Sequence, residues 1–258
     1  MTEHEEIIIE VSDFTAAYGD TVIIDDISFN VYKGEKFIIL GGSGCGKSTL
    51  LKHMIGLIRP AHGSVVIEGD DITQAEGSER IDILKRIGVA YQSGALFGSM
   101  TVLENVMLPL EEYTDLDSEA MELVGRMKLN LVGLTGSENK MPSELSGGMI
   151  KRAALARAMA LDPDILFLDE PSAGLDPITS AELDELIIQL SHTLGVTFVI
   201  VTHELNSIYN IADRVIMLDK STKGIIATGK PEYLRDNSTI SVVQKFFRRQ
   251  TDEQLGIE

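Results

Sequence analysis

Hydrophobic residues follow the two-residue period of half-buried strands early in the chain and form short continuous runs further on. Segments 5–11 and 27–31 alternate between apolar and polar residues, which predicts strands with one buried face. Continuous apolar runs predict further strands at 37–40, 64–68, 87–91, 165–168, 196–201 and 214–218. Because helical patterns lie between several of these runs, we expect an α/β fold with a mostly parallel sheet, and an antiparallel β layer from the early strands.

Strand patterns are missing between Thr101 and Ala160. Apolar residues there recur at helical spacing, and the alanine-rich stretch 146–159 is typical of a helix. We therefore expect a helical lobe, inserted at about residues 98–160, within a single domain that spans residues 1–240.

A C-terminal helix and tail are expected at residues 241–258. Val242, Val243, Phe246 and Phe247 fall on one face of this helix. That face either packs on the chain's own domain or reaches a partner subunit. The last residues, 251–258, are expected to fray.

The composition limits the setting in which the chain works. Its formal net charge of −18 at pH 7 repels nucleic acid and anionic lipid, so we expect no nucleic-acid partner and no tight direct binding to lipid. No apolar run approaches the roughly 20 residues of a membrane span, and the acidic N-terminus lacks the apolar core of a signal peptide. We expect a cytosolic or peripheral protein, and its single cysteine excludes an internal disulfide.

A glycine-rich loop follows the apolar run 37–40 and leads into a helical pattern. A strand, a loop of this composition and a helix in that order are typical of a phosphate-binding loop, because only a backbone without side chains brings many N–H donors close to a phosphate chain. Lys47 supplies an ammonium for the β and γ phosphates, and Ser48 a hydroxyl for Mg²⁺. The sequence therefore predicts a nucleotide site at Gly41, Gly42, Ser43, Gly44, Cys45, Gly46, Lys47, Ser48 and Thr49. The Cys45 side chain is expected to fill space there, with redox sensing as the alternative.

Two further segments carry candidate chemistry. The run 165–168 ends in Asp169, a candidate Mg²⁺ residue, and Glu170, a candidate general base that orients the attacking water. Ser146, Gly147 and Gly148 form a second anion site at a helix start, which is useful if it serves a nucleotide held by another copy of the chain. In isolation these segments also fit a strand end and a helix cap.

Together the phosphate loop, LSGGM at 145–149, ILFLDE at 165–170, SAGLD at 172–176 and the lone His203 resemble the nucleotide-binding domain of an ABC ATPase, from about Ile7 to Asp219. The resemblance implies ATP and Mg²⁺ as cofactors and a head-to-tail dimer of two copies. It also implies that Tyr18 stacks on adenine and that Gln92 contacts Mg²⁺ or the water. His203 would bind the γ-phosphate and Asp176 would communicate across the dimer. Asp176 also fits a helix cap before Pro177, and the others fit ordinary strand ends.

The strings QSGALF at 92–97 and MPSELSGGM at 141–149 narrow the resemblance to ATPase subunits of bacterial Mla and Mce-associated lipid transporters. That resemblance implies phospholipid transport, at the cytoplasmic face of the inner membrane. It implies as partners an integral-membrane permease, an Mce-domain lipid-binding protein and a STAS-like accessory subunit. We expect docking through protein contacts in a groove near residues 92–97. The ATPase of a small-solute importer and a soluble ABC ATPase, such as a metal-cluster assembly factor, remain alternatives.

Overall fold

The computed structural model describes residues 6–249, and contacts divide the chain into two compact units. The first unit combines the residues up to Thr73 with those from Val201 onward, and the second unit runs from Gln74 to Ile200. The second unit takes in strands as well as helices, so the predicted domain of residues 1–240 with its lobe at 98–160 stays a prediction. The acidic segment 1–5 and the segment 251–258, expected to fray, lie outside the described residues.

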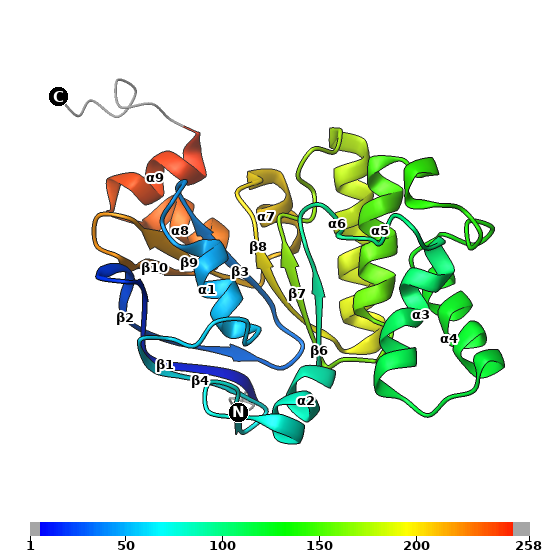
Figure 1. The fold of residues 1–258 in the computed structure, drawn as a ribbon. Helices are drawn as coiled ribbons and strands as arrows, with labels where there is room; N and C mark the ends of the chain where they lie inside the picture. Colours follow the sequence, from blue (N-terminus) through cyan, green and yellow to red (C-terminus); the bar gives the residue numbers. More distant parts are fainter. Residues whose placement is uncertain (1–5, 250–258) are drawn as a thin grey trace. The chain divides into compact units, whose positions relative to one another are not determined.

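The first unit contains the antiparallel layer that the early strands predict. Its strand order is β2-β1-β4-β5, and β1, β2 and β4 are labelled in Figure 1. The strands are β1 (Ile7–Tyr18), β2 (Thr21–Tyr32), β4 (His62–Ile67) and β5 (Asp70–Asp71). β1 and β2 are longer than their alternating patterns, because register shifts interrupt the pairing and Asp13 and Asp26 adopt positive φ angles of 50° and 49°. Such bulges move the side chains that follow to the other face and hide the two-residue period.

The phosphate loop of the first unit begins at the end of a buried parallel strand. β3 (Lys36–Gly41) pairs in parallel with β9 (Arg214–Asp219), which pairs antiparallel with β10 (Gly224–Gly229). Arg214 donates to both carboxylate oxygens of Glu35, at 2.7 and 2.9 Å, and its guanidinium lies over the ring of Phe37. These contacts hold the starts of β3 and β9 together, so the loop leaves from a rigid strand.

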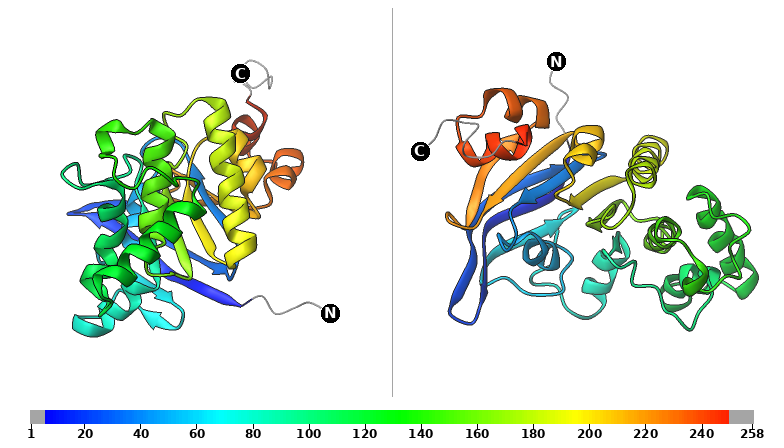
Figure 2. Two further views of the ribbon diagram at one scale, coloured as in Figure 1. Left: turned by 90° about the vertical axis from the view of Figure 1, so that its right-hand side faces the viewer. Right: turned by 90° about the horizontal axis from the view of Figure 1, so that it is seen from above.

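The helices of the first unit include the one that follows the phosphate loop and three late ones: α1 (Lys47–Met54), α7 (Leu205–Ile211), α8 (Pro231–Asn237) and α9 (Ser241–Arg248). Helices α8 and α9 lie side by side in both views of Figure 2. Val243 and Phe247 of α9 are buried, and the Tyr209 hydroxyl of α7 donates to the Phe247 carbonyl at 3.0 Å. This face therefore packs on the chain's own first unit, although Val242, predicted on the same face, is 45 % exposed.

The second unit joins parallel strands to a set of helices. Its strands are β6 (Ile87–Ala90), β7 (Ile165–Asp169) and β8 (Thr197–Val201), whose last residue belongs to the first unit. β6 pairs in parallel with β7, from Ile87 opposite Ile165 to Ala90 opposite Leu168. The residues that follow these two strands therefore emerge next to each other at one edge.

Helices fill the stretch in which strand patterns are missing (Figure 1). The helices of the second unit are α2 (Gly77–Lys85), α3 (Val102–Tyr113), α4 (Ser118–Leu131), η1 (Pro142–Glu144), α5 (Gly147–Ala158) and α6 (Pro177–Leu194). Thr101 and Glu104 form a capping box at the start of α3. The fully buried Asn105 binds backbone groups of Phe97, Met100 and Thr101, which fixes the segment before α3. None of the helices in the described part of the chain is both long and apolar enough to cross a membrane.

Candidate functional site

The predicted site residues are divided between the two units. The first unit holds Tyr18, His203 and the loop from Gly41 to Thr49, and the second holds Gln92, Ser146, Gly147, Gly148, Asp169, Glu170 and Asp176. The structure therefore contains two half-sites, one in each unit.

Two glycines of the phosphate loop are required by the fold itself. Gly41 has a φ of 150°, and a Cβ there would lie 2.4 Å from Cys45 Sγ and 2.5 Å from the Leu218 carbonyl oxygen. Gly46, just before α1, has a φ of 104°, and a Cβ there would lie 2.8 Å from Ile24 Cγ1. A side chain at either position would displace β9, the Cys45 thiol or the β2 side chain that supports the loop.

The other side of the loop is open to a ligand. A Cβ at Gly42 or Gly44 would meet no atom within 4 Å, and the side chains of Ser43 and Ser48 are exposed. The Lys47 ammonium donates to the carbonyls of Gly41 at 2.8 Å and Gly42 at 3.1 Å, so it lies over the loop. Helix α1 starts at Lys47 and presents the free N–H groups of its first turn there. This is a cradle of N–H donors, one ammonium and hydroxyls, which fits a phosphate chain.

Cys45 faces the protein interior. Its side chain is 2 % exposed, and burial raises the pKa of its thiol, an effect that the Lys47 ammonium opposes. Any contact of Cys45 with a nucleotide is therefore limited to its backbone. A buried thiol with a raised pKa also disfavours the redox-sensing alternative.

Tyr18 and His203 are both accessible in the first unit. Tyr18 is the last residue of β1 and is 50 % exposed, so part of its side chain is accessible to a ligand. His203 is exposed two residues after the end of β8. Their assignments to adenine and to the γ-phosphate stay predictions.

In the second unit, three predicted residues meet at the edge where β6 and β7 end. Asp169 is the last residue of β7 and Glu170 follows it, while Gln92 comes two residues after the end of β6. The pKa of Tyr91, the residue before Gln92, is raised mainly by burial and also by the nearby Asp169 carboxylate. Asp169 and Tyr91 are therefore close enough to interact, as the parallel pairing of β6 and β7 requires.

Two cations that the sequence patterns do not single out contact the loops of this edge. Lys151 donates to the backbone carbonyls of Gln92 and Glu170, and Arg157 donates to those of Gly94 and Ala95. Both belong to α5, an alanine-rich helix whose other residues, apart from Arg152, are apolar or glycine. Charged residues within such a helix are the signal from which they could have been found.

The residues of the predicted second anion site differ in accessibility. Ser146 is the N-cap of α5, its hydroxyl accepting from the Met149 N–H at 3.3 Å, and both Ser146 and Gly147 are exposed. Gly148 is buried, and a Cβ there would lie 2.5 Å from Thr179 Cγ2 of α6. The absence of a side chain at Gly148 therefore serves the packing of α5, and only its backbone remains for a ligand.

Asp176 is the N-cap of α6. Its carboxylate accepts from the N–H groups of Ile178 and Thr179, at 3.0 and 3.1 Å, and from the Thr179 hydroxyl at 2.5 Å. The hydrogen bonds from Thr179 are the main reason that the pKa of Asp176 is lowered. The structure thus supports the capping alternative, while communication across a dimer stays a prediction.

Within residues 6–249, no group of three or more His, Cys, Asp or Glu side chains is arranged to hold a metal ion. In nucleotide enzymes Mg²⁺ is usually bound through phosphate oxygens, water and one or two protein oxygens. The exposed Ser48 hydroxyl at the start of α1 and the carboxylate of Asp169 have the oxygen chemistry that such an ion prefers.

Comparison with known sequences identifies relatives along almost the whole chain. The profile of the family described as "ABC transporter" matches residues 24–173. The Haemophilus influenzae intermembrane phospholipid transport system ATP-binding protein MlaF is 40 % identical over 95 % of this chain and 92 % of its own length. The Mycobacterium leprae probable ribonucleotide transport ATP-binding protein mkl is 40 % identical over 97 % of this chain and 72 % of its own length.

Solved structures with the same fold include a nucleotide-bound dimer. The ATP-binding cassette MJ0796, solved as a dimer in a post-hydrolysis state with ADP and Pi, is 30 % identical and matches with a TM-score of 0.78 over 86 % of this chain and 98 % of its own. The Clostridium perfringens protein cbiO1, part of the transporter complex cbiONQ, is 28 % identical, with a TM-score of 0.82 over 98 % of both chains.

Proposed function

The chain belongs to the ABC transporter family and is an ATPase of that family, and from this premise we propose that it powers the movement of phospholipid between bacterial membranes. The observation that carries the proposal is its likeness to the Haemophilus influenzae MlaF protein across nearly the full length of both chains. The Escherichia coli MlaF protein is likewise 43 % identical over 89 % of this chain.

A second candidate is the ATPase of a small-solute importer. The mkl proteins, named for probable ribonucleotide transport, reach 41 % identity in Mycobacterium tuberculosis. This is close to the identity with the MlaF proteins, so sequence likeness alone does not choose the cargo. A soluble ABC ATPase, such as a metal-cluster assembly factor, is the alternative of another class.

The phosphate loop would hold the triphosphate of ATP. Its open side offers the N–H groups around Gly42 and Gly44, and the Lys47 ammonium, now bound to two carbonyls, would bind the β and γ phosphates instead. Ser48 and Asp169 would hold Mg²⁺, which neutralises charge that develops on the phosphates. Tyr18 would carry the adenine on its exposed ring.

Hydrolysis would depend on the edge where β6 and β7 end. Glu170 would orient the attacking water and accept its proton, Gln92 would contact the same water or Mg²⁺, and His203 would bind the γ-phosphate. Glu170 has a φ of 48°, a left-handed conformation that is costly for a residue other than glycine. Strain of this kind is typical of a group that the surrounding structure holds in place for a reaction.

Two copies would close head to tail around two ATP molecules. The exposed Ser146 hydroxyl and the first N–H groups of α5 would bind the γ-phosphate held by the Lys47 loop of the other copy. To convert a dominant open state into a dominant closed one, ATP must bind the closed state more favourably than the open state by on the order of 5 kcal/mol. Two nucleotides shared by one interface would supply this free energy, and hydrolysis would allow the closed dimer to open.

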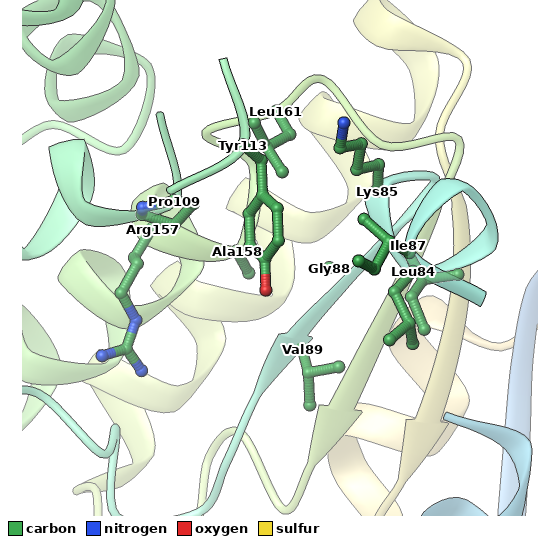
Figure 3. Close-up of a pocket in the computed structure, with 11 residues that line it drawn as sticks. Leu84, Lys85, Ile87, Gly88, Val89, Pro109, Tyr113, Arg157, Ala158 and Leu161 are labelled. Carbon is green, nitrogen blue, oxygen red and sulfur yellow. The ribbon is translucent and has the colours of Figure 1, made fainter. Parts of the chain in front are cut away.

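The proposed permease docks at a pocket of the second unit. Its volume is about 190 Å³, and it lies among the end of α2, strand β6 and helices α3 and α5. Figure 3 shows the Tyr113 ring between Arg157 on one side and Ile87 and Gly88 on the other. The expected groove near residues 92–97 is close by, because Arg157 also holds the carbonyls of Gly94 and Ala95.

The remaining parts of the complex are proposed from the same relatives. They are an Mce-domain lipid-binding protein and a STAS-like accessory subunit, with the ATPase bound peripherally at the cytoplasmic face of the inner membrane. The net charge of −18 supports docking through protein rather than through anionic lipid or nucleic acid.

Purification of the intact complex in mild detergent tests the proposal. We expect a multispanning protein to copurify with the chain, phospholipid to be found in the complex by mass spectrometry, and ATP hydrolysis to accelerate in phospholipid vesicles. A purely soluble assembly would favour the non-transport alternative. A membrane complex without bound phospholipid, whose ATPase responds to a small solute instead, would favour the importer.

A further inference from the structure

Helix α5 contacts the backbone of both loops that leave the edge of β6 and β7. The Lys151 ammonium donates to the carbonyl of Gln92, and its bond to the carbonyl of Glu170 is 3.3 Å long. Gln92 and Glu170 lie far apart in the sequence, and each is the proposed hydrolytic residue of its loop. One side chain therefore joins the backbones that carry both groups.

The Glu170 carbonyl lies at the strained point of its loop. With a φ of 48°, Glu170 turns its peptide groups away from the strand direction of β7. Its carbonyl accepts from the Ala173 N–H at 3.2 Å and from Lys151. An ammonium bound to a carbonyl is a charge-assisted hydrogen bond, stronger than a neutral one, and it helps to keep this residue in its left-handed conformation.

The surroundings of Lys151 are suited to a fixed contact rather than a mobile one. Lys151 is half-buried within the second unit. A desolvated ammonium is costly unless its donors are used, and here two of its three donors meet backbone carbonyls.

We propose that Lys151 is a positioning residue for ATP hydrolysis, which ties the backbones of Gln92 and Glu170 to helix α5, whose N-cap is Ser146. Both groups then keep one geometry relative to each other and to the first turn of α5. The inference rests on the proposed roles of Gln92 and Glu170, but not on the identity of the transported cargo.

Arg157 provides an independent hold on the same loop. It donates to the carbonyls of Ala95 at 2.8 Å and Gly94 at 3.0 Å, and a Cβ at Gly94 would lie 2.6 Å from Ile150 Cγ2. The segment after Gln92 is thus packed on α5 by contacts that do not involve Lys151. Loss of Lys151 should alter the position of the loops without detaching them.

The test compares three variants in the assembled complex. Lys151→Met keeps the approximate length of the side chain and removes its charge and its hydrogen-bond donors. Lys151→Arg keeps the charge and the donors. Lys140→Met makes the same chemical change at an exposed lysine of the same unit. In Lys151→Met we expect kcat for ATP hydrolysis to fall by about tenfold or more, while KM stays within about twofold of wild type. In Lys151→Arg we expect kcat to recover in part. In Lys140→Met we expect kcat to stay unchanged.

Amide hydrogen exchange gives a readout that needs no hydrolysis. In Lys151→Met we expect faster exchange in segments 91–97 and 169–174, with the rest of the second unit unchanged. The proposal is overturned if kcat stays within about twofold of wild type, if neither loop exchanges faster, or if exchange rises throughout the unit, as for a merely structural residue. A wild-type complex that hydrolyses ATP but carries no phospholipid contradicts the proposed transport function and leaves both readouts for Lys151 intact.

Discussion

Gly148→Ala tests whether the glycine in the first turn of α5 is required for packing against α6. The added Cβ would lie 2.5 Å from Thr179 Cγ2, closer than two carbon atoms approach in proteins. Thr179 cannot rotate away freely, because its hydroxyl donates to Asp176 Oδ2 at 2.5 Å as part of the α6 cap. Helix α5 or the cap of α6 must therefore shift.

The expected loss follows from two opposing contributions. Overpacking of a close contact typically costs about 1–3 kcal/mol. Replacing glycine by alanine within a helix gains up to about 1 kcal/mol, and less in the first turn, where Gly148 lies. We therefore expect unfolding free energy to fall by about 1–2 kcal/mol, and the thermal midpoint by roughly 2–4 °C for each kcal/mol in a chain of this size.

Thermal or urea unfolding of matched variants measures this loss. Gly147→Ala is the control, because a Cβ there would meet its nearest neighbour, Leu175 Cδ2, at an ordinary 3.5 Å. Thr179→Ser removes the obstructing methyl group and keeps the hydroxyl, so Gly148→Ala combined with Thr179→Ser should recover most of the stability. A Gly148→Ala protein as stable as Gly147→Ala, or no recovery in the double variant, would refute the packing role of Gly148.

Three other predictions concern the half-sites. Lys47→Ala removes the ammonium that lies over the phosphate loop, so we expect the assembled complex to lose ATP binding or turnover, and normal ATPase activity would rule out its assignment. Glu170→Gln should bind ATP, form a closed dimer seen by size-exclusion chromatography and hydrolyse at least about 100-fold more slowly; turnover at the wild-type rate would place the base elsewhere. Because burial raises the pKa of Cys45, its alkylation should be slow at neutral pH and keep accelerating at a more alkaline pH than for an ordinary thiol. Rapid labelling at neutral pH would show that the thiol is accessible.

Hydrophobic patterning was enough to place most strands and to predict the fold class, which the family and its solved relatives confirm. The buried runs at 37–40 and 165–168 correspond to β3 and β7 within one residue at each end. Buried parallel strands are continuous apolar runs, so their limits are visible in the sequence. The second half of β1 and the first half of β2 were not predicted, because the bulges at Asp13 and Asp26 break the alternation of apolar and polar residues.

The phosphate loop was predictable because its residues are consecutive and its conformation is local. The contacts of Lys151 and Arg157 were not, since both cations bind backbone carbonyls that lie about 60 residues earlier. The positions of these carbonyls depend on how β6 ends and how the loop after it packs, and the pattern of side chains in the sequence does not predict them. For the same reason the packing role of Gly148 becomes visible only when α6 is in place.

Helix α5 joins the three features that the proposed cycle must couple. Ser146 lies at its start, Lys151 roughly 8 Å and Arg157 roughly 17 Å further along its axis, at 1.5 Å per residue. Ser146 is proposed to meet the nucleotide of another copy, Lys151 holds the backbones of Gln92 and Glu170, and Arg157 lines the pocket proposed for the permease. Since a helix of this length moves nearly as a rigid body, a displacement at the pocket must also shift the loop carbonyls bound to Lys151 and Arg157. The hydrolytic residues therefore need no separate contact with the permease to respond to it.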